Sequence, residues 1–472
     1  MTQTSATSTS RWRERAMRPV SATRSYVQGV ASHSPARLAL LAFMSVIALF
    51  TLLLALPISS KTGEFTVLHD ALFTAVSAVC VTGLTVVSTA EHWSFWGQVF
   101  ISLGVFIGGL GILTIASLLS LAVSKKLGVR GKLLAQNSMS TTASGTLGEV
   151  GSLLRIVITT SIVIQLALML VLTPRFIVLG ESFPTALWHG TFYAISAFNN
   201  AGFTPHSDGL VPYEMDPFIL IPLMVGVFIG SLGFPVILVL LHFGWSFSKW
   251  NVHTKITIIG SFALVVVGTV GWGLLEWNNV RTIGEMEAGD KIVHAIFASI
   301  MTRSGGFNLV DQALMESRTM LATDALMFVG GGSASTAGGI KITTLAVLFL
   351  AIFAEARGER DVKAFGRTIP EGTLRVAFSV VVLGATLVAT ACGLLMSVSS
   401  ATLDRVLFES ISAFATVGLS TNLSAELPPA GKYILAALMF AGRIGTITLA
   451  SALSLKQRDQ LYRYPEERPI IG

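Results

Sequence analysis

The chain of 472 residues is 52% hydrophobic and only 12% charged. Soluble domains carry roughly 25% charged residues, so the composition excludes a soluble globular domain and predicts an integral membrane protein. The formal net charge is +6. Because the basic residues are unevenly placed along the chain, membrane topology explains them first. The two cysteines, Cys80 and Cys392, both lie in apolar stretches, so we expect buried thiols and no disulfide framework.

Apolar segments of spanning length, about 20 residues each, alternate with shorter helix-like stretches along the chain. The eight long segments lie near 37–57, 93–122, 150–173, 217–244, 255–275, 322–354, 374–398 and 430–455. The short stretches cover 70–80, 184–199, 290–302 and 404–415. They are too short to span a bilayer and suit re-entrant helices, which are stable only inside protein or beside a wet cavity.

Each short stretch ends at a glycine turn. The four turns read VCVTGLT from residue 79, NNAGF from 199, RSGGF from 303 and ATVGL from 415, and their key glycines are Gly83, Gly202, Gly306 and Gly418. The motif ISAF precedes the second and fourth turns at the same offset, whereas the third turn fits with one extra residue. This pattern predicts an all-α membrane protein of four fused helix–pore helix–helix repeats around a pseudo-fourfold pore, with eight transmembrane helices.

The predicted repeats cover residues 37–148, 149–253, 254–371 and 372–456, between a basic arm (1–36) and a tail (457–472). Most of the 32 Lys and Arg residues lie on one side of the predicted spans, so both termini are expected in the cytoplasm. Three of the short helices are preceded by an aspartate that is expected to cap them: Asp70, Asp290 and Asp404. The remaining short helix, 184–199, begins with Pro184, which suits the first helical position. The protein is therefore predicted to cross the cytoplasmic membrane many times.

A dehydrating cation needs replacement oxygens, and backbone carbonyls from four loops can supply them. The four turns contain no carboxylate, which favours carbonyl coordination of a monovalent cation over a charged ring. Side chains of Thr82, Asn199, Asn200 and Thr416 either brace the turns or add oxygens. The predicted selectivity filter comprises Val81, Thr82, Gly83, Asn200, Ala201, Gly202, Ser304, Gly305, Gly306, Thr416, Val417 and Gly418.

Together, the elements VTGLT, NNAGF, R-x-GGF and TVGLST resemble the Trk/Ktr/HKT superfamily of potassium transporters over residues 37–460. Length and span number are closest to the bacterial Ktr-type membrane subunit. The resemblance implies potassium uptake, a homodimer with one pore per subunit and a separate cytoplasmic nucleotide-binding ring of the RCK type. It implies no cofactor on this chain, with K⁺ as the transported ion and Na⁺ considered as an activator. Gly305 stands where the family often has alanine.

The sixth apolar segment is interrupted at 329–341 by VGGGSASTAGGIK. Irregular backbone at membrane depth must line a cavity, and the resemblance implies a gating loop beneath the filter; a plain connection between two helices is the alternative. Its key residues are Gly330, Gly331, Gly332, Gly338, Gly339 and Lys341. Arg443, in the last span, is costly in a membrane and marks a functional site. The resemblance places it near the loop, and a structural ion pair is the alternative.

Two other functions are considered. A secondary transporter with inverted repeats is disfavoured, because each predicted repeat holds two crossings and all four therefore share one orientation. A membrane sensor without transport would leave the filter-like glycines unexplained. No catalytic motif lies in a plausible setting, so we expect no enzyme. His189 and His294, on short helices, are expected to be packed or outward-facing instead of acting as ligands.

Overall fold

The computed structural model describes residues 35–111 and 149–454. The predicted N-terminal arm up to residue 34, the end of the second apolar segment, the 123–148 loop and the tail lie outside the described residues. Within them the chain is helical, apart from one two-stranded hairpin formed by β1 (Lys363–Ala364) and β2 (Arg367–Thr368).

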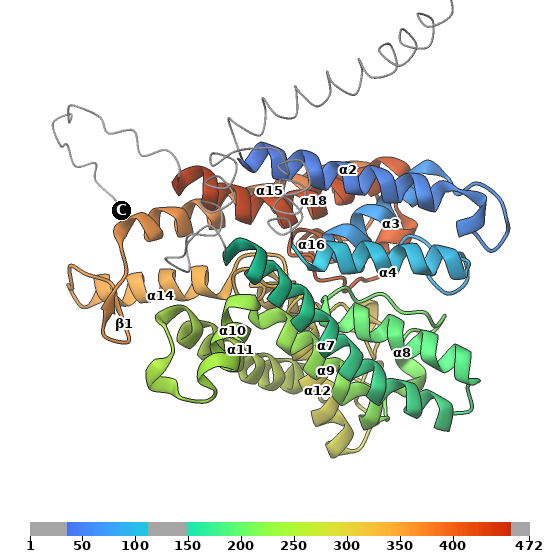
Figure 1. Cartoon of the computed structure of the whole chain (residues 1–472), viewed down its shortest axis with the longest axis horizontal. Coiled ribbons are helices and arrows are strands. Elements are labelled where there is room, and N and C mark those ends of the chain that lie inside the picture. The colour runs from blue at the N-terminus through green and yellow to red at the C-terminus, as the bar shows by residue number, and fades with distance from the viewer. Residues whose placement is uncertain (1–34, 112–148, 455–472) are drawn as a thin grey trace, which may run out of the picture.

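Long and short helices alternate along the chain (Figure 1). The long or paired helices are α2 (Pro35–Ala55), α4 (Phe95–Gly109), α7 (Glu149–Val178), α9 (Pro217–Leu232), α10 (Phe234–Phe243), α11 (Val252–Glu276), α13 (Ser317–Phe328), α14 (Ile342–Ala356), α15 (Glu371–Val398) and α18 (Pro429–Ser454). The helices that end at the glycine turns are α3 (Leu68–Cys80), α8 (Phe183–Phe198), α12 (Ala288–Met301) and α16 (Leu403–Phe414). Minor elements are η1 (Pro57–Ser59), η2 (Val211–Tyr213), η3 (Phe247–Lys249), η4 (Gln312–Leu314) and α17 (Leu423–Glu426).

The four short helices agree with the predicted stretches to within two residues at each end. The expected caps were wrong in detail. Asp70, Asp290 and Asp404 lie inside the first helical turn, and no side chain caps these helices. A carboxylate in the first turn still favours the positive end of the helix. Asp70 has a second role there, because it forms a 2.7 Å ion pair with Lys432 at the start of α18.

Three described helices are long and apolar enough to cross a membrane unaided: Arg155–Val178, Val252–Glu276 and Glu371–Val398. A fourth span results if α9 and α10 count as one, and the expected eight remain a prediction. The outward faces of these helices expose large apolar side chains, such as Leu170 (67%), Val267 (62%) and Val382 (63%). Such extensive apolar exposure is typical of a surface that contacts lipid.

The fourth apolar segment was expected to be continuous, but it bends by 99° between α9 and α10. The bend lies at Gly233, whose φ of 93° suits glycine. The backbone of the 329–341 segment lies against this glycine, and the Phe234 N–H donates to the Ala334 carbonyl over 3.3 Å. The predicted break in the sixth segment is confirmed, since residues 329–341 separate α13 from α14. The two broken segments therefore meet.

The described helices form two groups that face each other in Figure 1. Helices α2, α3, α4, α15, α16 and α18 pack in one group, and α7, α8, α9, α11 and α12 in the other. Cys80 and Cys392 are buried and free, as expected. The four glycine turns are buried, and their close contacts join the ends of α3 and α16 in one group to the ends of α8 and α12 in the other.

Candidate functional site: a ring of four glycine turns

All four turns share one unusual backbone conformation. In each, a residue with positive φ is followed two positions later by a glycine with positive φ: Val81 (58°) and Gly83 (90°), Asn200 (61°) and Gly202 (68°), Ser304 (65°) and Gly306 (73°), and Thr416 (48°) and Gly418 (95°). Positive φ is uncommon outside glycine and costs energy, most of all for a β-branched residue. Its recurrence at the same position of all four turns therefore reflects a common structural requirement.

The four glycines close into a ring. A Cβ on Gly83 would overlap the Ala201 carbonyl, and one on Gly202 would lie 2.7 Å from the Cα of Gly306. A Cβ on Gly306 would lie 2.6 Å from the Val417 carbonyl oxygen, and one on Gly418 would overlap the Thr82 carbonyl. Each turn thus contacts the next, and the fourth contacts the first. No side chain fits at these positions without moving backbone.

The turns are supported by serines of the short helices. The Ser77 and Ser412 hydroxyls accept from the Gly83 and Gly418 N–H groups over 3.0 and 3.1 Å. Ser196, at the same offset from Gly202, donates to the Phe203 carbonyl over 2.9 Å. The third turn has Ile300 at this offset. Its extra residue shifts the sequence register, so this turn lacks the serine support that the other three share.

Close helix packing holds the ring from outside. Cβ atoms on Gly108 of α4, Gly230 of α9 and Gly442 of α18 would overlap the carbonyls of Val79, Phe198 and Phe414 respectively. Each of these carbonyls lies four residues before a ring glycine. The helices α3, α8, α12 and α16 direct their C-termini towards the ring, where their dipoles contribute partial negative charge. That field favours a cation at the centre.

Two turn side chains connect the ring to the 329–341 loop. The Ser304 hydroxyl lies 2.8 and 3.1 Å from the Thr416 and Ala415 carbonyls, and it accepts from the Gly338 N–H over 3.1 Å. Asn200 donates to the Arg303 carbonyl over 3.2 Å and accepts from Thr336 of the loop over 3.1 Å. Asn200 therefore braces its neighbours. The Thr82 and Thr416 hydroxyls are buried without a hydrogen-bond partner among the described residues.

The predicted loop residues and Arg443 lie together against this ring. Arg443 is buried, and its guanidinium donates to the Thr336 carbonyl of the loop and, over 2.9 Å, to the Gly108 carbonyl at the end of α4. Lys341 donates to the Ala337 carbonyl over 2.6 Å. Among the described residues, no ion pair involves Arg443. The Arg443 guanidinium therefore binds backbone carbonyls of the loop and of α4.

The glycines of the loop allow its backbone to pack tightly against the ring. A Cβ on Gly338 would overlap Thr416 of the fourth turn, and one on Gly339 would lie 3.0 Å from Ala415. Gly331 and Gly332 pack on the end of α9, where the Gly332 N–H donates to the Ser231 carbonyl over 2.8 Å. Gly330 pairs with Ile340 over 2.8 Å and closes the base of the loop.

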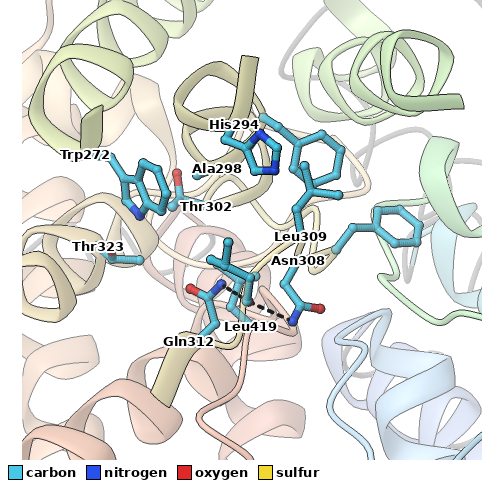
Figure 2. Close-up of a pocket in the computed structure, with 12 residues that line it drawn as sticks. Trp272, His294, Ala298, Thr302, Asn308, Leu309, Gln312, Thr323 and Leu419 are labelled. Carbon is cyan, nitrogen blue, oxygen red and sulfur yellow. Dashed lines mark hydrogen bonds between the residues drawn. The ribbon is translucent and has the colours of Figure 1, made fainter. Parts of the chain in front are cut away.

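A pocket lies beside the ring of glycine turns (Figure 2). It lies between α11, α12, α13 and the segments that leave the third and fourth turns, and Phe307 and Leu419 line it directly after Gly306 and Gly418. Asn308, Gln312 and Thr323 add polar groups to a mostly apolar wall. None of the lining residues is acidic.

Sequence reasoning missed two kinds of supporting residue. The serines of the short helices were detectable, because Ser196 and Ser412 occur within the repeated ISAF motif. Glu409, on α16, was not singled out. Its buried carboxylate accepts from the Ser420 hydroxyl over 2.7 Å, from the N–H groups of Thr421 and Ser424 and from the Ser424 hydroxyl. It therefore holds the chain that leaves the fourth turn.

Buried turns that meet in a ring, inside helices with apolar outer faces, are the features of an integral membrane protein built around four repeated turns. The chain belongs to the TrkH family of cation transport proteins, which it matches over residues 31–464. This result confirms the resemblance and identifies a transport family, not an enzyme family.

Named relatives agree with the family. The chain is 37% identical to the Ktr system potassium uptake protein B of Vibrio alginolyticus, over 92% of this chain and 94% of that protein. It is 34% identical to the protein of the same name in Bacillus subtilis, over 93% and 97%. It is also 31% identical to the potassium/sodium uptake protein NtpJ of Enterococcus hirae, over 93% and 97%.

A solved structure shares the fold. The potassium transporter TrkH from Vibrio parahaemolyticus has a TM-score of 0.65 at 17% identity, covering 87% of this chain and 84% of that one. The helical membrane-transporter fold therefore extends over most of the chain.

Proposed function

We propose that this chain is the membrane subunit of a potassium uptake system and conducts K⁺ through the ring of glycine turns. The relatives named above are potassium or potassium/sodium uptake proteins. The observation that carries the proposal is the closed ring, in which four turns adopt the same pair of positive-φ residues. Na⁺ is kept as a candidate activator.

The ring supports an architecture of four fused repeats with eight membrane crossings. Each turn follows a short helix, and three of the four short helices are packed by glycines of the following long helix in the same way. The proposed boundaries remain 37–148, 149–253, 254–371 and 372–456, between the arm and the tail. In this arrangement the chain is a multi-pass protein of the cytoplasmic membrane with both termini inside.

The filter would coordinate K⁺ through backbone carbonyls of the residues at 81–83, 200–202, 304–306 and 416–418. Positive φ at alternate positions reorients successive carbonyls, which is the geometry that such filters need. Only one glycine in each turn has positive φ. We therefore infer a short filter with few sites and a selectivity for K⁺ over Na⁺ that is less strict than in filters with longer runs of carbonyls.

The 329–341 loop would act as the gate. It contacts the third and fourth turns through Gly338 and the second turn through Thr336. A plain connection between α13 and α14 would not need these contacts. Arg443 would hold the loop in place and oppose resting cations beneath the filter. The partners proposed are a second copy of this chain and an RCK-type nucleotide-binding ring on the cytoplasmic side.

A complementation experiment tests the transport proposal. The chain is expressed with its regulatory partner in a strain that lacks potassium uptake, and growth is scored on low-potassium medium. Gly306→Ser should abolish rescue, because a Cβ there would lie 2.6 Å from the Val417 carbonyl oxygen. Gly271→Ser is the matched control, since a Cβ on Gly271 meets no atom within 4 Å. Failure of the wild-type chain to rescue would favour a membrane sensor.

One observation keeps the secondary transporter in view: both broken segments meet beneath the ring, and broken helices are typical of alternating-access sites. Flux measurements in proteoliposomes separate the two mechanisms. A channel-like pore lets K⁺ flow down an imposed voltage without a coupled ion. A strict requirement for a counter-gradient of Na⁺ or H⁺ would support the transporter instead.

A further inference from the structure

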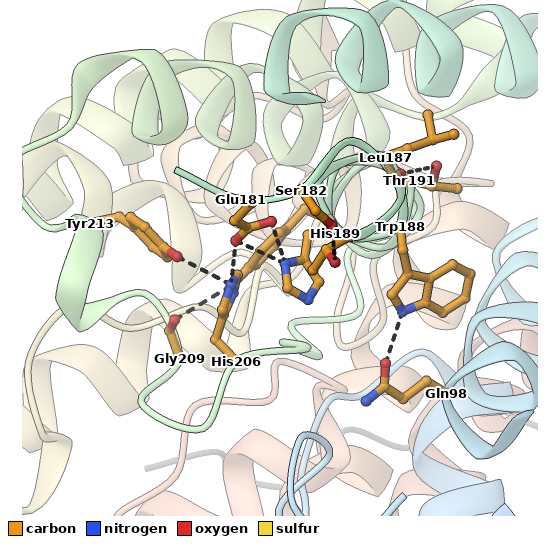
Figure 3. A network of polar contacts seen from close by, with 12 residues as sticks. Gln98, Glu181, Ser182, Leu187, Trp188, His189, Thr191, His206, Gly209 and Tyr213 are labelled. Atoms are coloured by element: carbon orange, nitrogen blue, oxygen red, sulfur yellow. Dashed lines mark hydrogen bonds and ion pairs between the residues drawn. The ribbon is translucent and has the colours of Figure 1, made fainter. Parts of the chain in front are cut away.

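Three side chains converge on one another away from the ring: Glu181, His189 and His206 (Figure 3). The Nδ1 atom of His189 lies 2.9 and 3.0 Å from the two carboxylate oxygens of Glu181. The Nε2 atom of His206 lies 3.2 Å from Glu181 Oε1. One ligand atom from each residue falls within 4.8 Å of the others. The two imidazole rings, 4.3 Å apart between centroids, therefore face the same carboxylate.

The three residues come from distinct parts of the second predicted repeat. Glu181 lies between α7 and α8, His189 on α8, and His206 four residues beyond Gly202 of the ring. Each of the three side chains is 16 to 18% exposed to solvent. They are sheltered enough to fix a geometry, yet an ion from solution can reach them.

Neighbouring tyrosines fix the orientation of His206. The Tyr193 hydroxyl lies 2.9 Å from His206 Nδ1, which leaves Nε2 directed at Glu181. Tyr193 is fully buried and stacks on Phe176, so its own position is fixed. A hydrogen bond on the far nitrogen is the usual way in which a metal-binding histidine is oriented. Tyr213 also approaches Nε2, at 3.1 Å, and would give up this contact to a metal.

We propose that Glu181, His189 and His206 form a binding site for a divalent transition-metal ion of the zinc class. Two imidazole nitrogens and one carboxylate are a common ligand set for Zn²⁺, with the fourth position left to water. Ligand atoms about 2.0 Å from a tetrahedral ion stand about 3.3 Å from one another. The Oε1 atom of Glu181 lies 3.0 Å from His189 Nδ1 and 3.2 Å from His206 Nε2, close to that spacing. Any proton shared at these contacts leaves when the ion binds.

The site would join two segments that must keep their positions if the second turn is to hold its shape. Binding ties His206, on the chain leaving the ring, to His189 on the helix leading into it. By the predicted topology this is the outer face of the protein, so external metal would reach it. The proposal goes beyond the transport function, because metal binding can be measured without any ion flux.

The test uses the purified full chain in detergent, titrated calorimetrically with ZnCl₂, MgCl₂ and CaCl₂ in separate experiments. The wild type should bind one Zn²⁺ per chain. It should show no binding of Mg²⁺ or Ca²⁺ at this site, because those ions prefer oxygen ligands. His189→Ala and His206→Ala should each weaken Zn²⁺ binding by more than about tenfold, which is the lower end of the loss reported for mere supporting residues. His242→Ala, which removes an exposed histidine on α10, should bind as the wild type does.

Two further variants guard against misfolding. His206→Asn keeps a polar side chain without an imidazole nitrogen, and Tyr193→Phe removes only the orienting hydroxyl. Both should retain the elution volume and thermal unfolding of the wild type in chelator while Zn²⁺ affinity falls. Zn²⁺ should raise the unfolding temperature of the wild type and not that of His206→Asn, because a ligand stabilises only the state that it binds. Absence of Zn²⁺ binding by the wild type, or equal binding by the His189→Ala/His206→Ala double variant, would overturn the proposal.

Discussion

The Ser304 hydroxyl offers the sharpest test of the proposed gate, because one oxygen touches three elements. It belongs to the third turn, lies 2.8 Å from the Thr416 carbonyl of the fourth turn and accepts from Gly338 of the loop over 3.1 Å. Ser304→Ala removes these contacts and a third, to the Ala415 carbonyl, without adding volume. The Gly338 N–H, which is buried, then has no acceptor while the loop stays in place.

The size of the effect follows from that lost acceptor. Leaving a buried donor unsatisfied costs roughly 1–3 kcal/mol. When the loop moves away, water can satisfy Gly338, so the cost falls on the arrangement seen here and not on the displaced one. A shift of 1.4 kcal/mol changes a two-state equilibrium tenfold. Ser304→Ala should therefore raise the ratio of displaced to seated loop by about fivefold to 150-fold.

The assay is uptake of Rb⁺ or K⁺ into proteoliposomes containing the purified chain without a regulatory partner. We expect flux through Ser304→Ala to exceed that of the wild type, as a larger share of channels is unblocked. Ser299→Ala is the matched control. Its buried hydroxyl, also near the third turn, donates to the Val265 carbonyl over 2.8 Å and has no hydrogen bond to the loop. It should leave flux unchanged.

Because Ser304 also contacts the fourth turn, the ratio of K⁺ to Na⁺ flux is measured in parallel. A rise in flux with an unchanged ratio assigns the effect to the loop alone, whereas a rise in flux with a fall in the ratio shows that the third turn loosens as the loop moves. Wild-type flux in Ser304→Ala, with both variants folded and inserted, would refute the reasoning that this contact holds the loop.

Three other changes have defined outcomes. Arg443→Ala should raise basal flux, since it removes charged donors from the Thr336 and Gly108 carbonyls; Arg443→Lys should restore part of the block, and identical flux in all three proteins would contradict the role. Glu409→Gln should lower the unfolding free energy by about 1–3 kcal/mol, measured by thermal melting, because an amide donor then faces the Thr421 N–H. Burial lowers the pKa of His92 below 6.5, opposed in part by Asp70. The stability that the neutral His92 ring contributes is therefore fully present above pH 6.5 and is lost as the pH falls below 6.5. The melting temperatures of the wild type and of His92→Gln should differ in pH dependence only below pH 6.5.

The glycine turns could be located from sequence because their constraint is local. A backbone that needs positive φ selects glycine at one position of each turn, and the same short motif therefore recurs at Gly83, Gly202, Gly306 and Gly418. The short helices could be bounded for the same reason, since each one ends where its turn begins. Arg443 was detectable because a lone charge in an apolar segment is rare.

The bend at Gly233 was not predicted, although the α9–α10 segment contains helix-breaking residues. Pro235 follows Gly233 by two residues, in the first turn of α10, and a proline there cannot continue the hydrogen bonds of α9. The 329–341 loop packed against Gly233 adds a long-range contact that the local sequence does not reveal. The contacts of His189, which was expected to be packed or outward-facing, could not be predicted from the sequence. Its partners Glu181 and His206 lie 8 and 17 residues away in sequence, at no spacing that marks a metal site.

The unequal support of the four turns has a mechanical consequence. The first, second and fourth turns are braced by a serine of their own short helix, whereas the third has Ile300 there. Its own helix supports it through the backbone, where the Gly305 N–H donates to the Met301 carbonyl over 2.8 Å. Side-chain hydrogen bonds add support from outside: Asn200 on the Arg303 carbonyl, Ser304 on the Thr416 carbonyl, and Ser304 with the loop. Displacement of the loop would remove the Gly338 contact of this turn, which has no serine of its own short helix to replace it. A gate that opens by moving the loop should therefore loosen the third quarter of the filter first, so that conductance and selectivity change together.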